Sequence, residues 1–445
     1  MLTRRRLHLL PLLLVIAACG CTKFQPMPLS DKPDLVMSLD QVVENVPPGT
    51  VNVSDGVDMT EIATIAASIN PDLRAVRMKR NVARAEAFSA GLLPDPQLAA
   101  TLDHPTTSGF INGYNIGPTF DVRSLFTRPV EKAAAENKAL GVDMDILWQE
   151  WQVIQKARTL YVEKYFGAQK LSLLKQMTEL DKQHQLRSQK SLSKGDATLE
   201  QASADLTSLM DAEGQMRTQQ RASLQTDYEL NALLGLAPGV AVPIRPPGLP
   251  AQASDAAMRA ALDTVADHRP DLKALRAAYK SQEATLYAAV LRQFPSISVG
   301  FNTARDTSNV HTAGLGVTLD LPIFNGSRGD IAVQSATREQ LHAEYQARLD
   351  QTHADIATLW RQTEMIRRQL GELQAQLPRL EAMAEKARKP YASGDFPALS
   401  YITLQSSLLS KKMEYIDLQQ ALWTNRIGLD TLLAWPLGPA GNKED

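Results

Sequence analysis

Cysteine and histidine are the side chains here that could hold a metal ion or act as a nucleophile, and both are sparse. The chain has two cysteines, at positions 19 and 21, and seven scattered histidines. His342 and His353 share a helical segment but are too far apart for a paired metal site. There is no phosphate-binding loop, Gly-x-Ser-x-Gly motif or His-Glu-x-x-His motif. The residues therefore predict neither an enzyme nor a metal centre.

The two cysteines end a segment organised like a signal peptide. Three arginines precede an apolar run that is shorter than the about 20 residues needed to span a bilayer. The sequence IAAC, residues 16–19, resembles a lipobox, at which a cysteine is lipidated and becomes the mature N-terminus. We expect a signal peptide over residues 1–18 and a covalent lipid, palmitate included, on Cys19. Cys21 is the weaker candidate, and two incidental cysteines are the alternative.

The residue after Cys19 and the net charge bear on location and partners. An Asp after the cysteine would resemble an inner-membrane retention signal, whereas Gly20 favours the outer membrane of a Gram-negative bacterium. The net charge is −2, so nothing suggests a nucleic-acid partner.

Two pairs of alternating segments predict β-hairpins. Residues 295–302 and 312–321 alternate apolar and polar side chains around a polar loop, and residues 96–103 and 115–122 do the same. Alternation gives each strand one apolar face and one polar face. The second hairpin places Thr318 and Asp320 on its polar face, and the first places Thr119 and Asp121 there.

An internal duplication organises the rest of the chain. The segment Asn70-Pro71-Asp72-Leu73 matches Arg269-Pro270-Asp271-Leu272, and the same offset of 199 residues relates many later positions. We infer two repeats, residues 56–236 and 253–435, joined by a linker over residues 237–252. An N-terminal lipid-anchored arm, residues 19–55, precedes them, and a disordered tail, residues 436–445, follows.

Each hairpin leads into a very long helical pattern, at about residues 129–193 and 328–392. Sixty-five residues at about 1.5 Å rise give a helix about 100 Å long. The second shows apolar residues at a coiled-coil spacing, interrupted by Pro378, where we expect a bend or break. Gly-Asp turns and returning helices follow, at about residues 198–234 and 397–433.

Four strands per chain cannot close a barrel, and lipid does not tolerate an open sheet edge. If the hairpins lie in a membrane, several chains must share one barrel, and three chains would supply twelve strands. The apolar face would then contact lipid. The polar face would line the lumen with Thr119, Asp121, Thr318 and Asp320.

Taken with the duplicated pattern, the lipobox, the Arg-Pro-Asp-Leu segment and the LPIFNG segment at residues 321–326, the chain resembles the TolC-like outer-membrane efflux channel family. It is most similar to the lipoprotein branch that works with resistance-nodulation-division pumps. The resemblance implies a mainly α fold with transmembrane β: a homotrimeric twelve-stranded barrel and a helical periplasmic tunnel. It also implies a periplasmic adaptor and an inner-membrane pump as partners. Such a duct is passive and needs no cofactor.

The resemblance also carries roles to particular residues. In the family, Gly-centred turns at the tunnel tip dock the adaptor, which corresponds to Gly195, Asp196, Gly394 and Asp395; a plain helix C-cap is the alternative. The family often narrows its tip with Asp rings six and nine residues after the Gly. Gln201 and Ala204, and Ser400 and Thr403, stand there instead, with Asp205 adjacent. We therefore expect a constriction of hydroxyl and amide groups from Gln201, Ser400 and Thr403, with the carboxylate of Asp205 beside it.

Two other functions remain open at this stage: a type I protein-secretion duct, and a secreted coiled-coil scaffold without transport activity. The cargo is open as well. The Leu93-Pro94-Asp95-Pro96 run resembles metal-efflux members of the family, and the Arg269-Pro270-Asp271-Leu272 run resembles drug-efflux members.

Overall fold

A computed structural model describes residues 24–44, 46–393 and 395–434. The chain divides into two units at Leu35, and the described residues 24–35 of the first contain no helix or strand. The second unit begins at Val36 and holds the elements named below. The expected signal peptide, Cys19, Gly394 and the C-terminal tail lie outside the described residues.

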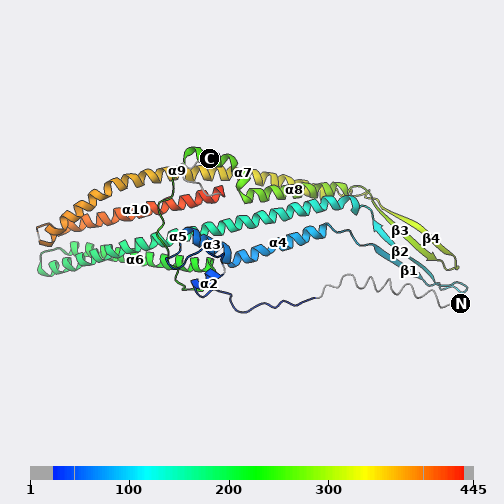
Figure 1. Ribbon diagram of the computed structural model, residues 1–445, viewed down its shortest axis with the longest axis horizontal. Helices are drawn as coiled ribbons and strands as arrows, with labels where there is room; N and C mark the ends of the chain where they lie inside the picture. The colour runs from blue at the N-terminus through cyan, green and yellow to red at the C-terminus, as the bar shows by residue number, and fades with distance from the viewer. Residues whose placement is uncertain (1–23, 45, 394, 435–445) are drawn as a thin grey trace. The chain divides into compact units, whose positions relative to one another are not determined.

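The second unit alternates helices with two hairpins (Figure 1). Its first half contains α2 (Leu39–Glu44), α3 (Met59–Ile69), α4 (Pro71–Ala90), β1 (Gln97–Asp103), β2 (Gly113–Asp121), α5 (Ser124–Lys194) and α6 (Leu199–Leu233). Its second half contains α7 (Asp255–His268), α8 (Pro270–Leu291), β3 (Ser296–Arg305), β4 (His311–Asp320), α9 (Arg328–Ser393) and α10 (Ala398–Leu433). Among the described residues, none of the helices is both long and apolar enough to cross a membrane.

The helix boundary at Asn70 follows from local chemistry. The Asn70 side chain accepts a hydrogen bond from the backbone N–H of Leu73 and thereby caps α4. Pro71 occupies the first helical position, where its missing N–H costs nothing. The break between α3 and α4 is therefore encoded in two adjacent residues.

The duplication is visible in equivalent contacts. In the first half the Asn70 side chain donates to the carbonyl of Leu233 at 2.7 Å. In the second, at the same offset of 199 residues, Arg269 donates to the carbonyl of Leu432 at 3.0 Å. Arg269 is also paired with Asp271 at 2.6 Å, and both side chains are buried. In each half, the residue that precedes a helix (α4 or α8) therefore bonds to the C-terminal end of the returning helix (α6 or α10). The first half uses an amide for this contact and the second half uses a guanidinium.

Of the bend or break expected at Pro378, the break is wrong, because α9 runs unbroken from Arg328 to Ser393. The coiled-coil spacing explains this result. Ile366, Leu370 and Leu373 are buried before the proline and Ala384 and Ala387 after it, and α9 lies along α10. Packing on both sides outweighs the about 3 kcal/mol that an interior proline costs a helix.

The arm and the linker are more structured than the sequence indicated. From Val36 onward the arm packs into the main core, where Val42 is fully buried, and residues 39–44 form α2. In the linker Val242 is buried in the same core, and Ile244 forms a bridge with Val57. Apolar residues at spaced positions, rather than a helical period, anchor these Pro-rich segments.

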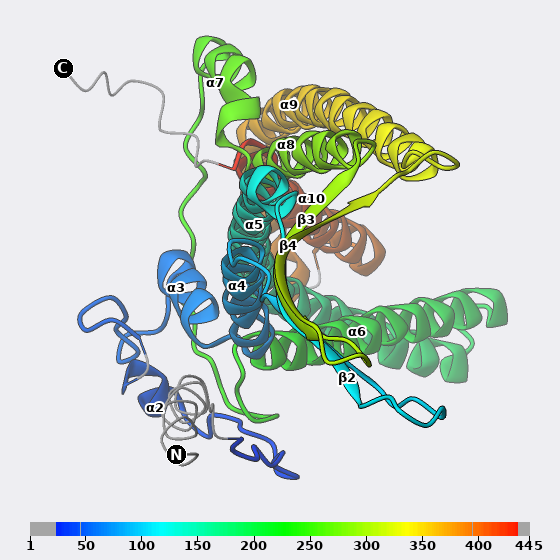
Figure 2. The same ribbon diagram turned by 90° about the vertical axis from the view of Figure 1, so that its right-hand side faces the viewer.

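Within the second unit the four strands lie at one end of the helices, and the α5–α6 and α9–α10 turns lie at the opposite end (Figure 1). The strands form one antiparallel sheet in the order β1-β2-β3-β4. Seen from that end, the sheet is curved rather than flat (Figure 2). Strands distant in sequence therefore meet through the β2–β3 pairing, which joins the two repeats.

Candidate functional site

The candidate site is the curved sheet, because its register sorts side chains by polarity. Ile297 pairs with Leu319, and Val299 pairs with both Val317 and Phe120. Since successive residues of a strand point to opposite sides, every apolar pair falls on one face. The sequence predicted this alternation within each strand, and the register aligns it across all four.

The apolar face is uncovered in the single chain. The exposed fractions are 69% for Leu98, 77% for Leu102, 81% for Leu315 and 63% for Val317. Contiguous exposed apolar surface of this kind marks a protein or membrane contact. The charged or titratable side chains on this face, Tyr114, Arg305 and His311, are at its loop end.

The opposite face carries small and polar side chains. Thr119 lies opposite Gly300, Asp121 and Thr318 both lie opposite Ser298, and Asp320 lies opposite Ser296. The Ser296 hydroxyl donates to the Asp320 carboxylate at 2.7 Å. The register therefore brings the four residues predicted for the lumen onto one face, at the end of the sheet near the helices.

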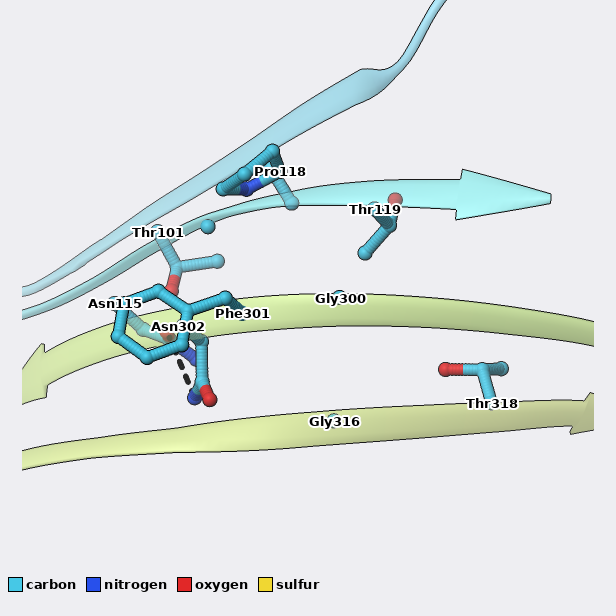
Figure 3. Close-up of a pocket in the computed structure, with 11 residues that line it drawn as sticks. Thr101, Asn115, Pro118, Thr119, Gly300, Phe301, Asn302, Gly316 and Thr318 are labelled. Carbon is cyan, nitrogen blue, oxygen red and sulfur yellow. Dashed lines mark hydrogen bonds between the residues drawn. The ribbon is translucent and has the colours of Figure 1, made fainter. Parts of the chain in front are cut away.

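A hollow of about 170 Å³ opens on this face where glycines replace side chains (Figure 3). Gly300 and Gly316 form part of it, and Asn302 donates to Asn115 beside it at 3.4 Å. At Gly117 a Cβ atom would lie 2.3 Å from the carbonyl oxygen of Phe301. Glycine is therefore required at Gly117 by the close approach of β2 and β3, a requirement that the sequence did not reveal.

The sheet has two unpaired edges within the chain, β1 and β4. An unpaired edge presents a row of free N–H and C=O groups. The edge strands are antiparallel to each other, as three successive antiparallel pairings require. A β4 edge can thus pair with the β1 edge of a second copy in the same antiparallel sense.

The helix turns at the other end hold the residues predicted to dock an adaptor. Gly195 has φ 81°, the left-handed region, and its N–H donates to the Leu192 carbonyl at 3.0 Å. The N–H of Asp196 donates to Ser191, and that of Asp395 donates to Pro390. The first turn is therefore a C-cap closed by its own backbone, with Gly195 and Asp196 exposed. At the second turn the described contact is the hydrogen bond from Asp395 to Pro390.

The residues predicted for the constriction make contacts within their own helices or within the α5–α6 hairpin. Gln201 forms a capping box with Thr198 at the start of α6. Asp205 pairs with His184 of α5 at 3.2 Å. Ser400 is exposed, and the Thr403 hydroxyl donates to the Leu399 carbonyl of its own helix. Whether these side chains narrow a tunnel stays a prediction.

The structure adds one contact near the turns that sequence reasoning missed. The guanidinium of Arg187, on α5, lies 4.9 Å from the ring centroid of Tyr391, on α9. Tyr391 in turn stacks on Tyr401 of α10, with centroids 4.1 Å apart. These side chains join the two helical hairpins, and no motif or spacing marks them in the sequence.

A search for metal-binding groups adds no second candidate site to the sheet among the described residues. Over the part of the chain that the structure describes, no group of three or more His, Asp or Glu side chains is arranged to hold a metal ion. Near the turns, burial raises the pKa of the Asp181 carboxyl while the nearby His184 opposes that rise.

Comparison with known proteins agrees with this geometry. Residues 261–434 match the model of the family described as outer membrane efflux protein. The chain is 25% identical over 175 residues to a probable outer membrane lipoprotein, SilC, of Salmonella typhimurium, which is 37% of this chain and 38% of SilC. It is 26% identical over 175 residues to the cation efflux system protein CusC of Escherichia coli K12, with the same shares covered. These matches span well under half of each curated relative.

Solved structures cover nearly the whole chain. The CusC structure matches with a TM-score of 0.66 at 17% identity and covers 91% of this chain and 98% of CusC. The outer-membrane channel OprN matches with a TM-score of 0.70 at 15% identity and covers 94% of this chain and 99% of OprN. The predicted fold is thus confirmed, because the chain has the fold of these channels. Residues 261–434 match the model of the predicted family.

Proposed function

We propose that this chain is the outer-membrane exit duct of an efflux system, working as a homotrimer without catalytic activity. The observation that carries the proposal is the sheet with one apolar face, one polar face and two free edges. Three copies joined β4 to β1 remove every edge and form a twelve-stranded barrel. The apolar face then contacts lipid, and the polar face encloses water.

The long helices supply the rest of the duct. α5 and α9 have 71 and 66 residues, which at about 1.5 Å per residue gives about 100 Å of helix below the sheet. In a trimer they and the returning α6 and α10 would surround one periplasmic passage. The Gly195–Asp196 and Gly394–Asp395 turns would meet a periplasmic adaptor, which connects the duct to an inner-membrane pump of the resistance-nodulation-division type.

Metal cations are the cargo that the curated relatives favour, since CusC is named for cation efflux. A third relative, 24% identical over 169 residues, is the cobalt-zinc-cadmium resistance protein CzcC of Cupriavidus metallidurans. The Leu93-Pro94-Asp95-Pro96 run, which resembles metal-efflux members, points the same way. A deletion strain should lose resistance to such metals and recover it with the wild-type chain. Recovery of drug resistance alone would contradict this cargo.

A pair of adjacent substitutions tests membrane insertion. Val317 and Thr318 are neighbours on β4 that point to opposite faces. Val317→Lys would place a charge in lipid at a cost of about 2–4 kcal/mol, whereas Thr318→Lys would place it in water. We expect a heat-sensitive trimer from wild type and Thr318→Lys in detergent, and a much smaller yield of trimer from Val317→Lys. A salt-extractable monomer, equally tolerant of both changes, would support a coiled-coil scaffold instead.

Lipidation of Cys19 is proposed from the sequence and agrees with the description of SilC as a lipoprotein. Labelling with radioactive palmitate, followed by gel separation, tests it. We expect label on the wild type and on Cys21→Ser, and none on Cys19→Ser. Label that persists on Cys19→Ser would contradict the assignment.

A further inference from the structure

We propose that three exposed methionines, Met78, Met210 and Met365, form a helical contact between neighbouring copies of this chain, in which α9 of one copy packs against α4 and α6 of the next. The proposal rests on the proposed function, because it needs the homotrimer. It goes beyond that function by assigning the side chains that join the helical walls. Two observations carry it: the order of the helices, and the offset of 199 residues between the repeats.

The helices form a layer with two free edges, as the strands do. Next to the sheet their order is α9-α8-α5-α4, and away from the sheet it is α9-α10-α5-α6. Seen from the sheet end, α9 and α6 lie at opposite ends of this layer (Figure 2). Because α9 follows β4 and α4 precedes β1, pairing of β4 with β1 of the next copy brings α9 beside α4 and α6 of that copy.

The contact between the two repeats of one chain shows how such edges fit together. We call this contact of α5 with α8 and α10 the internal seam. The offset of 199 residues carries α5 onto α9, so that their ends at Lys194 and Ser393 coincide, and it carries α8 and α10 back onto α4 and α6. The seam between copies is therefore expected to repeat the internal seam along the helices. The strand seams cannot be identical, because Val317 on β4 stands where β2 has Pro118.

The three methionines occupy positions that are buried at the equivalent place in the other repeat. Their counterparts lie on α8, α10 and α5 and have almost no exposed surface. Methionine is unbranched and adaptable, so it suits an irregular gap between helices. Its exposure in the single chain is explained by the missing neighbour. The pairs, with their exposed fractions, are Met78 (59%) and Ala277 (3%), Met210 (60%) and Leu409 (8%), and Met365 (47%) and Phe166 (3%).

One contact of the seam between copies is defined to a pair of side chains. At the internal seam the Ser281 hydroxyl, on α8, donates to the Ala134 carbonyl of α5 at 2.7 Å. The equivalent residues are Val82 on α4 and Val333 on α9, which are 60% and 61% exposed. Two valines can meet here without leaving a side-chain hydrogen-bonding group unsatisfied. We therefore expect Val82 of one copy to contact Val333 of the next.

The ion pairs of the internal seam support the equivalence, because both partners change together. Lys170 on α5 pairs with Asp417 on α10 at 2.5 Å, and Arg158 lies 3.9 Å from Asp430. A seam between copies that kept one partner of either pair would enclose an unpaired charge, which is strongly unfavourable. Neither pair leaves such a charge. The replacements are Gln369 and Thr218 for Lys170 and Asp417, and Ala357 and Asn231 for Arg158 and Asp430.

The test is cross-linking of cysteine pairs in the full-length protein with a short bismaleimide, in a Cys21→Ser background. Val82→Cys combined with Val333→Cys should give covalent dimers and trimers on a denaturing gel. The matched control combines Val82→Cys with Arg361→Cys and should run as a monomer. Arg361 is exposed on the same helix as Val333, but 28 residues away, which is about 42 Å at about 1.5 Å per residue. The single variants give the background of links through Cys19.

Two results would overturn the proposal. The first is a heat-sensitive trimer in which the Val82→Cys and Val333→Cys pair forms no links, and the second is equal linking in the Arg361→Cys control. Neither result bears on the proposed function, since the trimer is detected independently by its gel mobility. A wild-type chain that forms no trimer would refute the proposed function itself.

Oxidation of the wild-type trimer by hydrogen peroxide tests the same seam if the cysteine variants fail to assemble. Met27, in the first unit, is 94% exposed, and Met258 is buried at 3%. Met78, Met210 and Met365 should form sulfoxide several-fold more slowly than Met27 and about as slowly as Met258, because a neighbouring copy covers them. Oxidation of all three at the rate of Met27 would contradict the proposal.

Discussion

Replacing Gly117 by alanine should weaken the seam between the two repeats. A Cβ atom there would lie 2.3 Å from the Phe301 carbonyl oxygen and 2.8 Å from the Asn302 Cα atom, both backbone atoms of β3. Ordinary contacts begin near 3.4 Å, so β2 and β3 must separate locally by about 1 Å. The β2–β3 pairing already skips Gly117 and Pro118, and Pro118 has no N–H to donate to a neighbouring strand.

The expected cost combines two effects. Overpacking of a tight contact costs about 1–3 kcal/mol, and each weakened backbone hydrogen bond costs up to about 1 kcal/mol more. We therefore expect Gly117→Ala to destabilise the folded sheet by about 2–4 kcal/mol, a factor of roughly 30 to 1,000 in its equilibrium constant. The matched control is Gly316→Ala, the repeat-equivalent glycine on the same face, where an added Cβ meets nothing within 4 Å.

The assay is the midpoint of heat dissociation of the detergent-solubilised trimer, read from gel mobility. Gly117→Ala should lower the midpoint clearly, and Gly316→Ala should leave it close to that of the wild type. Equal midpoints for the wild type and both variants would refute the argument from close approach. If the midpoint fell equally in both variants, the conformational freedom of glycine would be the cause, and not the close contact with β3.

Three further predictions concern the helical part. Asp271→Asn should lower the free energy of unfolding by about 3–5 kcal/mol, because it leaves the buried charge of Arg269 unpaired. Asp72→Asn, at the exposed equivalent position, should change it by less than about 0.5 kcal/mol, and urea unfolding measures both. Burial, with Asp58 second, raises the pKa of Tyr161 to about 12 from 10.0. The folded state thus favours the neutral phenol of Tyr161. This contribution to the stability of the fold is complete below pH 10, and about 2–3 kcal/mol of it is lost as the pH rises toward 12. Tyr161→Phe should remove that pH dependence, and an unchanged slope would contradict it. Gly195→Ala should lower the stability of the fold by about 1 kcal/mol, because the φ of Gly195 is positive. Gly214→Ala, inside α6 with open space around it, should raise stability by up to about 1 kcal/mol. Thermal unfolding measures both, and changes of the same sign would be inconsistent with this reasoning.

Much of the fold was predictable because it rests on local and periodic signals. Asn70-Pro71 terminates one helix and begins the next by capping and by a missing N–H. The alternation from Ser296 to Phe301 requires a two-faced strand, and a constant offset of 199 residues requires two similar halves. None of these features depends on what another part of the chain does.

Prediction failed where packing between distant segments decides the outcome. Pro378 was expected to bend or break its helix, yet α9 continues without a break because buried residues lie on both sides of the proline and α9 packs along α10. The arm and linker were read as plain connections, whereas Val42 and Val242 are buried in a shared core. Apolar residues at irregular spacing carry no periodic signal, so their burial is visible only in three dimensions.

By itself the sequence determined the order of the elements, the duplication and the polarity of each strand, because these depend on neighbouring residues and on period. Only the tertiary structure decided which strands lie next to one another. The pairing of β2 with β3 places Gly117 against Phe301 and puts Asp121 and Asp320 on one face, about 200 residues apart in the chain. Register is a long-range property, and it is register that turns four alternating segments into one apolar wall and one polar wall.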